Sequence, residues 1–339
     1  MIVDTARSPS AGKLSCVVDT DLRFHLEAVR WFATLSGLAG VKPSDLVIHA
    51  VDGCDSEILQ YLRDCGVTVR SVERFDQRSP HCNKISGALA LSAMEFEGVA
   101  VLTDSDVVFL EDPRKTKLPD TSVASKTVDG ANPPLRTLRA TFTAAGLSRS
   151  ELWPVEWEPS EATLAGNANG GLYVIPRTLL PRVSAAWAHW ARWLLDHIDL
   201  LAERAVNVDQ VAMAMALAAE GIDPMRLEIR WNFPTHKPDR IAGSKESPAV
   251  IHYHDNLDDA GLLARTGTES VDHQIDIANA AIRQIWHEAV PKVPLSHSKH
   301  STDPPARLRS RRPEASRAEQ RSLLSTLAGI VRRARSRMR

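Results

Sequence analysis

The sequence predicts an α/β fold in which a mainly parallel sheet is flanked by helices. Apolar runs that are too short for helices recur along the first third of the chain. Between these runs lie stretches in which apolar residues recur at helical spacing. Two of the runs end in aspartates, Asp19 and Asp104. Strands that alternate with helices form a buried parallel sheet, and ligands bind at the carboxyl ends of its strands.

The first third of the chain is expected to contain four strands. The apolar runs that predict these strands are residues 14–19, 46–51, 67–69 and 99–103. Helices are expected between them, at residues 22–35, 56–65 and 83–94. Gly66 directly follows the second helix, at a position where helices commonly end.

The pattern is less regular after this point. Further strands are expected at residues 123–125, 171–175, 227–230 and 249–253, and helices at 133–146, 181–201 and 209–220, with an irregular stretch at 153–159. In the longest of these helices, Trp187 and Trp190 share an apolar face with Val183 and Leu194. Such a stripe is typical of core packing rather than of a ligand platform.

The composition is that of a folded protein with an ample apolar core. Of the 339 residues, 43% are hydrophobic and 24% are charged, which excludes disorder of the whole chain. No run approaches the roughly 20 apolar residues that span a bilayer, and the N-terminal residues lack the apolar core of a secretory signal. The four cysteines form no Cys-x-x-Cys pair, so reduced thiols in a cytoplasmic protein are expected.

The segment Asp104-Ser105-Asp106 carries the clearest chemical signal. It directly follows the apolar run at residues 99–103. Residues two apart in an extended segment point the same way, so both carboxylates are expected at one point of the crevice. Two hard oxygen ligands suit Mg²⁺ or Mn²⁺. The alternative is a solvated acidic turn after a strand.

Four motifs together resemble a known enzyme family. Asp104-Ser105-Asp106 resembles the DxD motif of glycosyltransferases with the GT-A fold. Residues 169–175, Asn-Gly-Gly-Leu-Tyr-Val-Ile, are similar to a segment of the retaining family that includes glycogenin and bacterial lipopolysaccharide galactosyltransferases. Asp209-Gln210 resembles the DQ motif of that family, and residues 250–254 resemble its late strand with a metal-binding histidine. Their order and approximate spacing agree, over about residues 14–260.

The resemblance implies roles for individual residues. It implies metal ligands, namely Asp104, Asp106 and His252. It implies residues that line the donor-sugar and acceptor site, namely Asn169, Asp209 and Gln210. It also implies residues that contact the donor, namely Asp19, Thr20, Asp21, Lys84, Asp104, Ser105 and Gly170. His254 is the second candidate for the histidine ligand. The chain departs from the family after His252, because the glycine and the lysine that usually follow in H-x-x-G-x-x-K are missing.

Each of these residues also has a purely structural interpretation. His252 could be a hydrogen-bonded histidine of the core, and Lys84 could be a surface lysine of a helix. Asn169 and Gly170 could form a turn before a strand. Asp209 could be a favourable charge in the first turn of a helix.

The resemblance implies a GT-A (Rossmann-like) fold and a metal-dependent glycosyltransferase that uses a nucleotide-sugar donor, with UDP-sugar expected. A retaining enzyme needs no carboxylate base, whereas an inverting one would, with Asp209 or Asp255 as candidates. One alternative is an inactive nucleotide-binding module tethered to a membrane or partner. Another is a sugar nucleotidyltransferase, although no glycine-rich basic loop follows the first strand.

The charge is distributed unevenly along the chain. Residues 307–339 contain 11 arginines and two glutamates, which leaves 30 basic and 40 acidic residues in the rest. This acidic body argues against nucleic-acid binding. We expect a glycosyltransferase domain at 1–290, with a nucleotide-binding half at about 14–112 and an acceptor half at 113–290. A linker at 291–316 and a basic amphipathic helix at 317–339 are expected to follow.

The basic helix is expected to bind an anionic membrane surface peripherally, on the inner face. This would suit an enzyme that acts on a glycan or a lipid-linked acceptor. A solvated tail without a fixed partner is the main alternative, and contact with RNA or DNA is a third.

Overall fold

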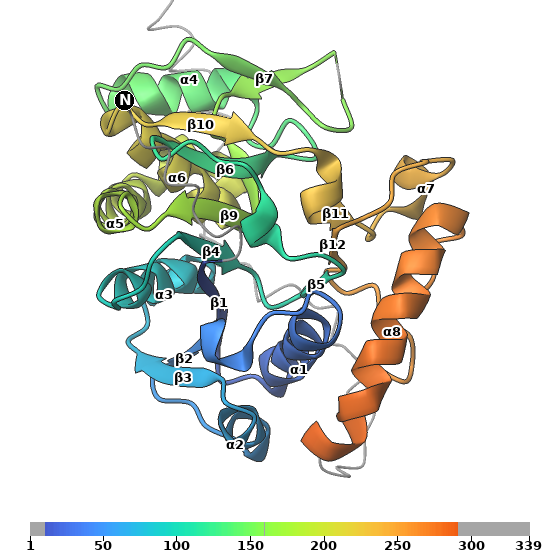
Figure 1. Ribbon diagram of the computed structural model, residues 1–339. Helices are drawn as coiled ribbons and strands as arrows, with labels where there is room; N and C mark the ends of the chain where they lie inside the picture. Colours follow the sequence, from blue (N-terminus) through green and yellow to red (C-terminus); the bar gives the residue numbers. More distant parts are fainter. Residues whose placement is uncertain (1–10, 159, 291–339) are drawn as a thin grey trace, which may run out of the picture. The chain divides into compact units, whose positions relative to one another are not determined.

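The computed structural model describes residues 11–158 and 160–290. A seven-stranded sheet has the order β10-β6-β9-β4-β1-β2-β3 (Figure 1). Its strands are β1 (Gly12–Val18), β2 (Leu46–Val51), β3 (Thr68–Val72), β4 (Val99–Thr103), β6 (Ser122–Thr127), β9 (Ala168–Pro176) and β10 (Asp223–Arg226). β9 is antiparallel to β4 and β6, and the other neighbours are parallel. The sheet is therefore mixed and mainly parallel, which confirms the predicted fold class.

Two smaller sheets extend this framework. One joins β11 (Phe233–Pro234), β12 (Val250–His252) and β5 (Val107–Phe109), with β12 in the middle. β12 runs antiparallel to β5, and its register pairs His252 with Val107. The other is a hairpin of β7 (Leu152–Pro154) and β8 (Ala162–Leu164). The first of these sheets brings residues near 252 to the end of β4.

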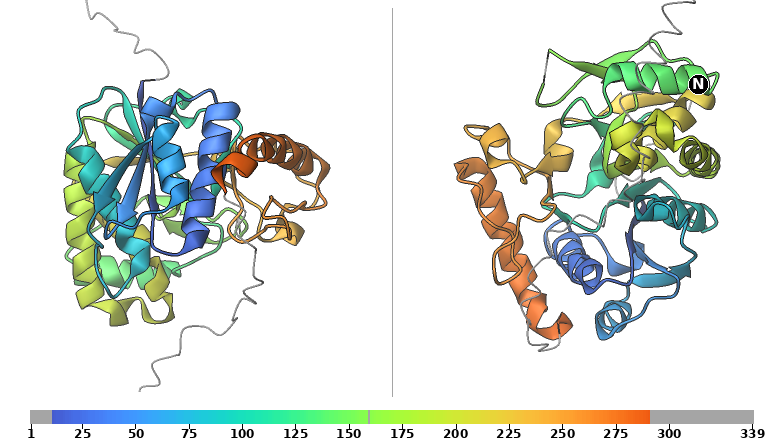
Figure 2. Two further views of the ribbon diagram at one scale, coloured as in Figure 1. Left: turned by 90° about the horizontal axis from the view of Figure 1, so that it is seen from below. Right: turned by 180° about the vertical axis from the view of Figure 1, so that it is seen from behind.

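Helices cover both faces of the large sheet (Figure 2). They are α1 (Leu22–Gly37), α2 (Glu57–Asp64), α3 (Asn83–Ser92), α4 (Leu135–Ala144), α5 (Leu180–Asp196), α6 (Val208–Ala219), α7 (Pro238–Ile241) and α8 (Glu269–Ala289). Short 3₁₀ segments lie at Pro43–Asp45, Pro80–Cys82, Pro113–Lys115, Ile198–Leu200, Ala202–Asn207 and Ile229–Asn232. One buried cluster contains residues of α3 to α6 and another contains residues of α1 and α2. α8 packs on α1 through a third.

Capping residues explain where several helices begin and end. The Asp21 side chain accepts a hydrogen bond from the backbone N–H of Arg23 at the start of α1. Ser56 does the same for Leu59 at the start of α2. Gly66 follows α2 with φ at 93°, a left-handed conformation that glycine adopts without strain. Asp21, expected to contact the donor, therefore also has a structural role.

Most expected elements are present, and the exceptions have physical reasons. The strand expected at 227–230 is wrong, because β10 ends at Arg226 and a 3₁₀ turn follows it. Leu227 is buried without joining a longer strand. Residues 153–159, expected to be irregular, begin inside the hairpin strand β7. α5 ends at Asp196 rather than near 201.

The helix of residues 269–289 was absent from the elements expected from sequence. The linker and basic helix expected beyond residue 290 lie outside the described residues.

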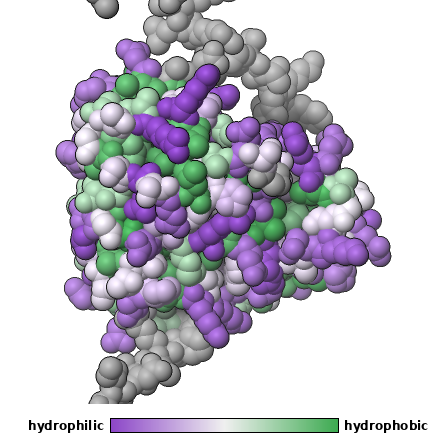
Figure 3. Space-filling model, turned by 90° about the horizontal axis from the view of Figure 1, so that it is seen from above, coloured by the Kyte–Doolittle hydropathy of each residue, from purple (hydrophilic) through white to green (hydrophobic). Residues whose placement is uncertain are grey.

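The tryptophan stripe of α5 belongs to the core, as predicted. Trp187 is fully buried and packs edge-on against Tyr173 of β9, with ring centroids 5.6 Å apart. Trp190 is partly buried and packs against the core cluster that contains Tyr173 and Trp187. On the molecular face drawn in Figure 3, polar and apolar side chains are interspersed. No helix in the described ranges is long and apolar enough to cross a membrane.

Candidate active site

The pairing of β5 with β12 brings Asp106 and His252 together. Asp106 immediately precedes β5, and His252 is the last residue of β12. The backbone N–H of Tyr253 donates to the carbonyl of Asp106 at 3.1 Å, which extends the pairing past both residues. Two side chains that lie 146 residues apart in the sequence therefore meet near the carboxyl end of β4.

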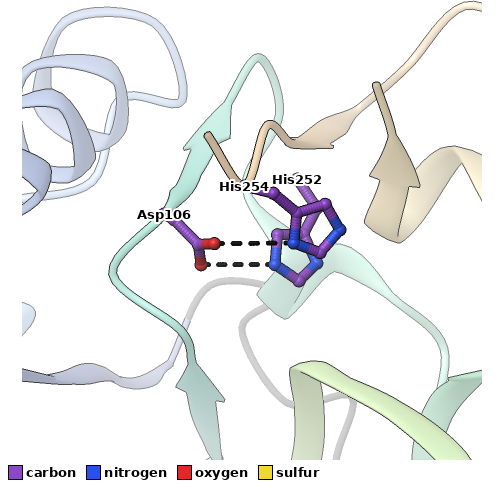
Figure 4. A group of neighbouring side chains, drawn as sticks. All are labelled: Asp106, His252 and His254. Carbon is purple, nitrogen blue, oxygen red and sulfur yellow. Dashed lines mark ion pairs between the residues drawn. The ribbon is translucent and has the colours of Figure 1, made fainter. Parts of the chain in front are cut away.

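His252 and His254 both face the Asp106 carboxylate (Figure 4). His252 Nε2 lies 3.2 Å from Asp106 Oδ1 and 3.9 Å from Asp104 Oδ2. His254 Nδ1 lies 3.6 Å from Asp106 Oδ2. One possible ligand atom from each of Asp106, His252 and His254 lies within 4.8 Å of the others. This spacing and donor set can hold a divalent metal ion.

The charges of this group are interdependent. Burial would raise the pKa of the Asp106 carboxyl, but the two neighbouring imidazoles outweigh burial and hold it well below its usual range. For His252, burial opposes the imidazolium while Asp106 favours it, and the net effect raises the pKa of His252. A buried carboxylate that depends on adjacent positive charge is one that a cation would also stabilise.

A chain of side-chain hydrogen bonds orients His252. Its Nδ1 lies 3.0 Å from Asn232 Oδ1, and Asn232 Nδ2 donates to Asn169 Oδ1 at 3.1 Å. Asn169 Nδ2 donates to Asp129 Oδ2 at 2.7 Å, and Lys126 pairs with the same carboxylate. An ionised carboxylate only accepts hydrogen bonds, so the orientation of both amides follows from Asp129. The His252 Nδ1–H therefore donates to Asn232, and the other ring nitrogen, Nε2, faces Asp106 and Asp104. Nε2 donates to Asp106 when the imidazole is charged and is the nitrogen that would bind a cation when the imidazole is neutral.

Gly171 leaves the space that His252 needs. A Cβ atom at this position would lie 2.4 Å from His252 Nδ1 and 2.9 Å from Asn232 Oδ1. The neighbouring backbone is fixed as well, because Asp104 N–H donates to the Gly171 carbonyl at 3.2 Å. β9 therefore lies directly against the candidate metal ligands, and only glycine fits there without displacing the imidazole.

A second group lies beside the first, around Lys84 and Gly170. Lys84 Nζ is 2.5 Å from Asp104 Oδ1 and also donates to the Gly170 carbonyl. A Cβ at Gly170 would lie 3.3 Å from Lys84 Nζ, 3.4 Å from Asp209 Oδ2 and 3.6 Å from Gln210 Cγ. Lys84 is buried, unlike the surface lysine of the alternative interpretation. α3, α6, β4 and β9 thus place these predicted residues together.

Asp209 is buried at the start of α6. Burial raises the pKa of its carboxyl, and the positive charge of Lys84 offsets part of this effect. The Trp187 indole donates to the Asp209 carbonyl at 2.8 Å, which ties this helix start to α5. Asp255, the other carboxylate considered as a base, is exposed after β12.

Asp19 lies in a separate network at the end of β1. Its two carboxylate oxygens each accept a hydrogen bond from Arg74 at 2.7 Å, and Asn83 Nδ2 donates to Oδ2 at 3.0 Å. The bidentate Arg74 contact lowers the pKa of Asp19 below its usual value. Thr20 donates its backbone N–H to Asp19 and is exposed. Asn83 and Lys84, adjacent in α3, thus connect the ends of β1 and β4.

Ser105 is engaged away from the carboxylates that flank it. Its hydroxyl donates to Glu27 Oε2 at 2.6 Å, and both side chains are buried. Burial raises the pKa of Glu27 to about 7, and the nearby charge of Asp106 adds to the effect. Through this contact, α1 holds the turn that carries Asp104 and Asp106.

Sequence reasoning missed several residues that shape the site. Asn232, Asp129 and Lys126 orient His252, Glu27 holds Ser105, and Arg74 pairs with Asp19. Asn232 stands in a stretch without a recognisable motif. The position of Arg74 just after β3, at the end of the sheet where ligands bind, was a usable signal.

Comparison with known proteins identifies the family. Residues 16–221 match the model of the Rhodobacterales glycosyltransferase domain. The fold resembles that of the galactosyltransferase LgtC, solved with donor and acceptor sugar analogs, with a TM-score of 0.51 and 13% identity over 83% of this chain and 98% of that chain. Mouse xyloside xylosyltransferase 1 matches with a TM-score of 0.45 and 14% identity over 72% of this chain and 98% of that chain. No curated protein sequence matches this one.

The resemblance to LgtC confirms the predicted GT-A fold. The family model covers more than half of the chain, on the strands and helices that carry most of the site. The chain therefore belongs to the Rhodobacterales glycosyltransferase domain family and is a glycosyltransferase.

Proposed function

We propose that this glycosyltransferase is metal-dependent and transfers a sugar from a nucleotide-diphosphate donor, with a UDP-sugar expected, to a glycan or a lipid-linked acceptor. The observation that carries the proposal is the approach of His252 Nε2 to within 3.2 Å of Asp106 Oδ1, at the carboxyl end of a sheet strand. A shared cation accounts for both residues.

Asp104, Asp106 and His252 are the proposed ligands of Mn²⁺ or Mg²⁺. Their donor atoms fit such an ion, because carboxylate oxygens suit both metals and the His252 tautomer leaves Nε2 free to bind. When bound, the ion would supply positive charge to a nucleotide diphosphate as it leaves. The Gly171 backbone and the Asn232 amide keep the ligand imidazole in place.

Lys84 is proposed to supply a second positive charge for the diphosphate. It stands next to Asp104, and the lysine of the H-x-x-G-x-x-K pattern is missing after His252. Asp19, Thr20 and Asp21 are proposed to contact the nucleoside from the end of β1. Ser105 and Gly170 would line the donor site through the turn after β4 and the start of β9.

We propose transfer with retention, with Asn169, Asp209 and Gln210 lining the reacting centre. The anomeric C–O bond to the diphosphate breaks, and a bond from the acceptor oxygen to the same carbon forms. The acceptor's proton passes to the leaving phosphate oxygen, so no carboxylate base is needed. The burial of Asp209 beside Lys84 supports a positioning and electrostatic role, and the exposure of Asp255 gives that residue no special environment.

The test is a transfer and donor-hydrolysis assay on the full chain with a panel of nucleotide sugars. Activity is expected with Mn²⁺ or Mg²⁺ and is expected to fall to background with EDTA. Asp106→Asn should lower kcat/KM by at least about 100-fold, since it removes charge from the proposed ion site. Asp64→Asn, at an exposed carboxylate of α2 that pairs with Gln60, is the matched control and should retain activity. NMR of the product anomer reports retention or inversion.

The same assay separates the alternatives. An inactive module would bind a nucleoside diphosphate, measured by calorimetry, without hydrolysis or transfer. A nucleotidyltransferase would release pyrophosphate from a nucleoside triphosphate and a sugar 1-phosphate. Either result would contradict the proposal.

We further propose a peripheral membrane role for residues 317–339, with 1–290 as the catalytic domain, divided at about residue 112, and 291–316 as linker. The support is the excess of arginine after residue 306. Deleting residues 307–339 should leave transfer to a soluble acceptor intact and release the protein from anionic liposomes. Unchanged liposome binding after the deletion would contradict the membrane role.

A further inference from the structure

His254 has an unusual backbone conformation that directs attention to its side chain. Its φ is 52°, and Asp52 is the other non-glycine residue with positive φ in the described ranges. Side chains adopt this conformation infrequently, although histidine tolerates it better than most residues do. It occurs two residues after the end of β12 at His252.

The two imidazoles form a pair beside one carboxylate. Their ring centroids lie 3.8 Å apart, with an angle of 32° between the ring planes. The nitrogen-to-oxygen distances to Asp106 are 3.2 Å for His252 and 3.6 Å for His254. The second distance exceeds an ordinary hydrogen bond. Two ligands that each lie about 2.1 Å from an ion, at a right angle, are about 3 Å apart. The spacing therefore suits neighbouring ligands of one ion.

The carboxylates contribute unequally to this site. Asp104 Oδ1 is engaged with Lys84 at 2.5 Å, and its Oδ2 is 3.9 Å from His252. The ion pairs that Asp106 makes in the described part of the chain are both with histidines. His254 Nε2 is buried without a hydrogen-bond partner, so within the described part of the chain the polar contact of this ring is the approach of Nδ1 to Asp106. The donor set is therefore richer in imidazole nitrogen than a plain DxD site.

We propose that His254 is a second imidazole ligand of the metal ion and that the site therefore selects Mn²⁺ over Mg²⁺. This inference rests on the metal dependence proposed above and assigns a ligand beyond Asp104, Asp106 and His252. Imidazole nitrogen favours transition-metal ions over Mg²⁺, which prefers oxygen ligands. A transferase with two imidazoles in its ion site would discriminate between the two ions more strongly than one with a single imidazole.

The test uses the full chain and measures metal binding without substrate. Isothermal titration calorimetry gives the Kd for Mn²⁺ and for Mg²⁺, and electron spin echo envelope modulation of bound Mn²⁺ reports the number of coordinating nitrogens. The variant is His254→Asn, because asparagine also tolerates positive φ. The matched control is His236→Asn. The His236 ring packs edge-on against His254, with ring centroids 4.1 Å apart, but His236 does not belong to the group of possible metal ligands around Asp106.

We expect His254→Asn to weaken Mn²⁺ binding by about tenfold or more and Mg²⁺ binding by less than about threefold. The count of coordinating nitrogens should fall from two to one. His236→Asn should keep the wild-type Mn²⁺ affinity and both nitrogens. His254→Asp offers an oxygen in place of the imidazole and should move the preference toward Mg²⁺, which gives a second variant if His254→Asn does not fold.

Each failure has a distinct outcome. If the wild-type protein binds Mn²⁺ with a single nitrogen, and His254→Asn binds it equally well, the assignment of His254 is overturned while metal-dependent transfer stands. If the wild-type protein binds neither ion, both this inference and the metal dependence are overturned.

Discussion

Lys84 Nζ lies 2.5 Å from Asp104 Oδ1, which joins the first turn of α3 to the residue that follows β4. The same ammonium donates to the Gly170 carbonyl at the start of β9. The buried Lys84 side chain thus links α3, the end of β4 and the start of β9. Because its partner Asp104 is 36% exposed, water can screen part of the pair, and a bound diphosphate could share the ammonium.

Lys84→Met should impair donor binding more than folding. The free energy of unfolding is expected to fall by about 1–3 kcal/mol, because a partly buried carboxylate loses its partner. The Kd for a nucleoside diphosphate, measured by calorimetry, should rise by about tenfold or more. Lys13→Met removes a more exposed lysine, which pairs with Asp45 at 3.6 Å, and is the control. An unchanged nucleotide Kd in Lys84→Met would contradict the role proposed for Lys84.

Asn232→Ala should weaken Mn²⁺ binding by about 10–100-fold, the range typical of residues that orient a metal ligand. It leaves the proton on His252 Nδ1 without its acceptor and removes one of the two hydrogen bonds that Asn169 Oδ1 accepts, the other coming from the Gly171 N–H. Calorimetry with Mn²⁺ measures the effect.

The control for this prediction is Asn279→Ala. Asn279 is also buried, but its amide holds both backbone groups of Leu263, away from the metal ligands. Both variants should lower stability by about 1–3 kcal/mol, and only Asn232→Ala should change the Mn²⁺ affinity. Equal metal affinities in the two variants would show that the amide chain does not position His252.

Much of the fold could be predicted because buried parallel strands are apolar along their whole length. The runs at 46–51 and 99–103 have the bounds of β2 and β4. The strand expected at 227–230 failed because the alternation of apolar and polar residues does not continue as a strand: the Leu227 N–H still donates to the Ser125 carbonyl of β6, but a 3₁₀ segment begins at Ile229. α8 was missed although Val271, Ile275, Ala278 and Ile282 repeat at helical spacing and are buried.

The site could be predicted only where a residue's chemistry is visible in the sequence. Asp104, Asp106 and His252 stand at strand ends within short motifs, so their approach could be anticipated. Asn232 and Glu27 act through side chains that reach across elements. Their roles depend on the register of β5 with β12 and on how α1 packs, which no local pattern specifies.

Gly171→Ala and Gly170→Ala should separate metal binding from donor binding. A Cβ at Gly171 would overlap His252, with 2.4 Å to its Nδ1, so Mn²⁺ affinity should fall by at least about tenfold. A Cβ at Gly170 meets Lys84 and Asp209 at 3.3 Å or more. Gly170→Ala should therefore keep Mn²⁺ binding and raise the KM for the donor.

Gly37→Ala is the control for both glycine variants. Its Cβ would meet Ala281 at an ordinary 3.7 Å, so metal binding and transfer should both be unchanged. If Gly171→Ala binds Mn²⁺ like the wild type, the crowding of His252 by β9 is not a determinant of the site.

Glu27 should make the free energy of unfolding depend on pH between about 4.5 and 7. Burial, together with the charge of Asp106, raises the pKa of Glu27 from 4.5 to about 7. Between these values the native state binds more protons than the unfolded state, so the contribution of Glu27 to stability is full below pH 4.5 and is lost as pH rises toward 7. The slope from this one group approaches about 1.4 kcal/mol per pH unit.

Glu27→Gln keeps an oxygen that can accept the Ser105 hydroxyl and removes the titration. Urea unfolding at several pH values from 4.5 to 8 should therefore show the variant gaining stability relative to the wild type as pH rises, with the difference levelling off above pH 7. The comparison is between two proteins at each pH, so titrations elsewhere in the chain largely cancel. A stability difference that is constant across this range would show that Glu27 does not titrate in it. The Ser105 hydroxyl would then donate to an ionised Glu27 carboxylate throughout this pH range.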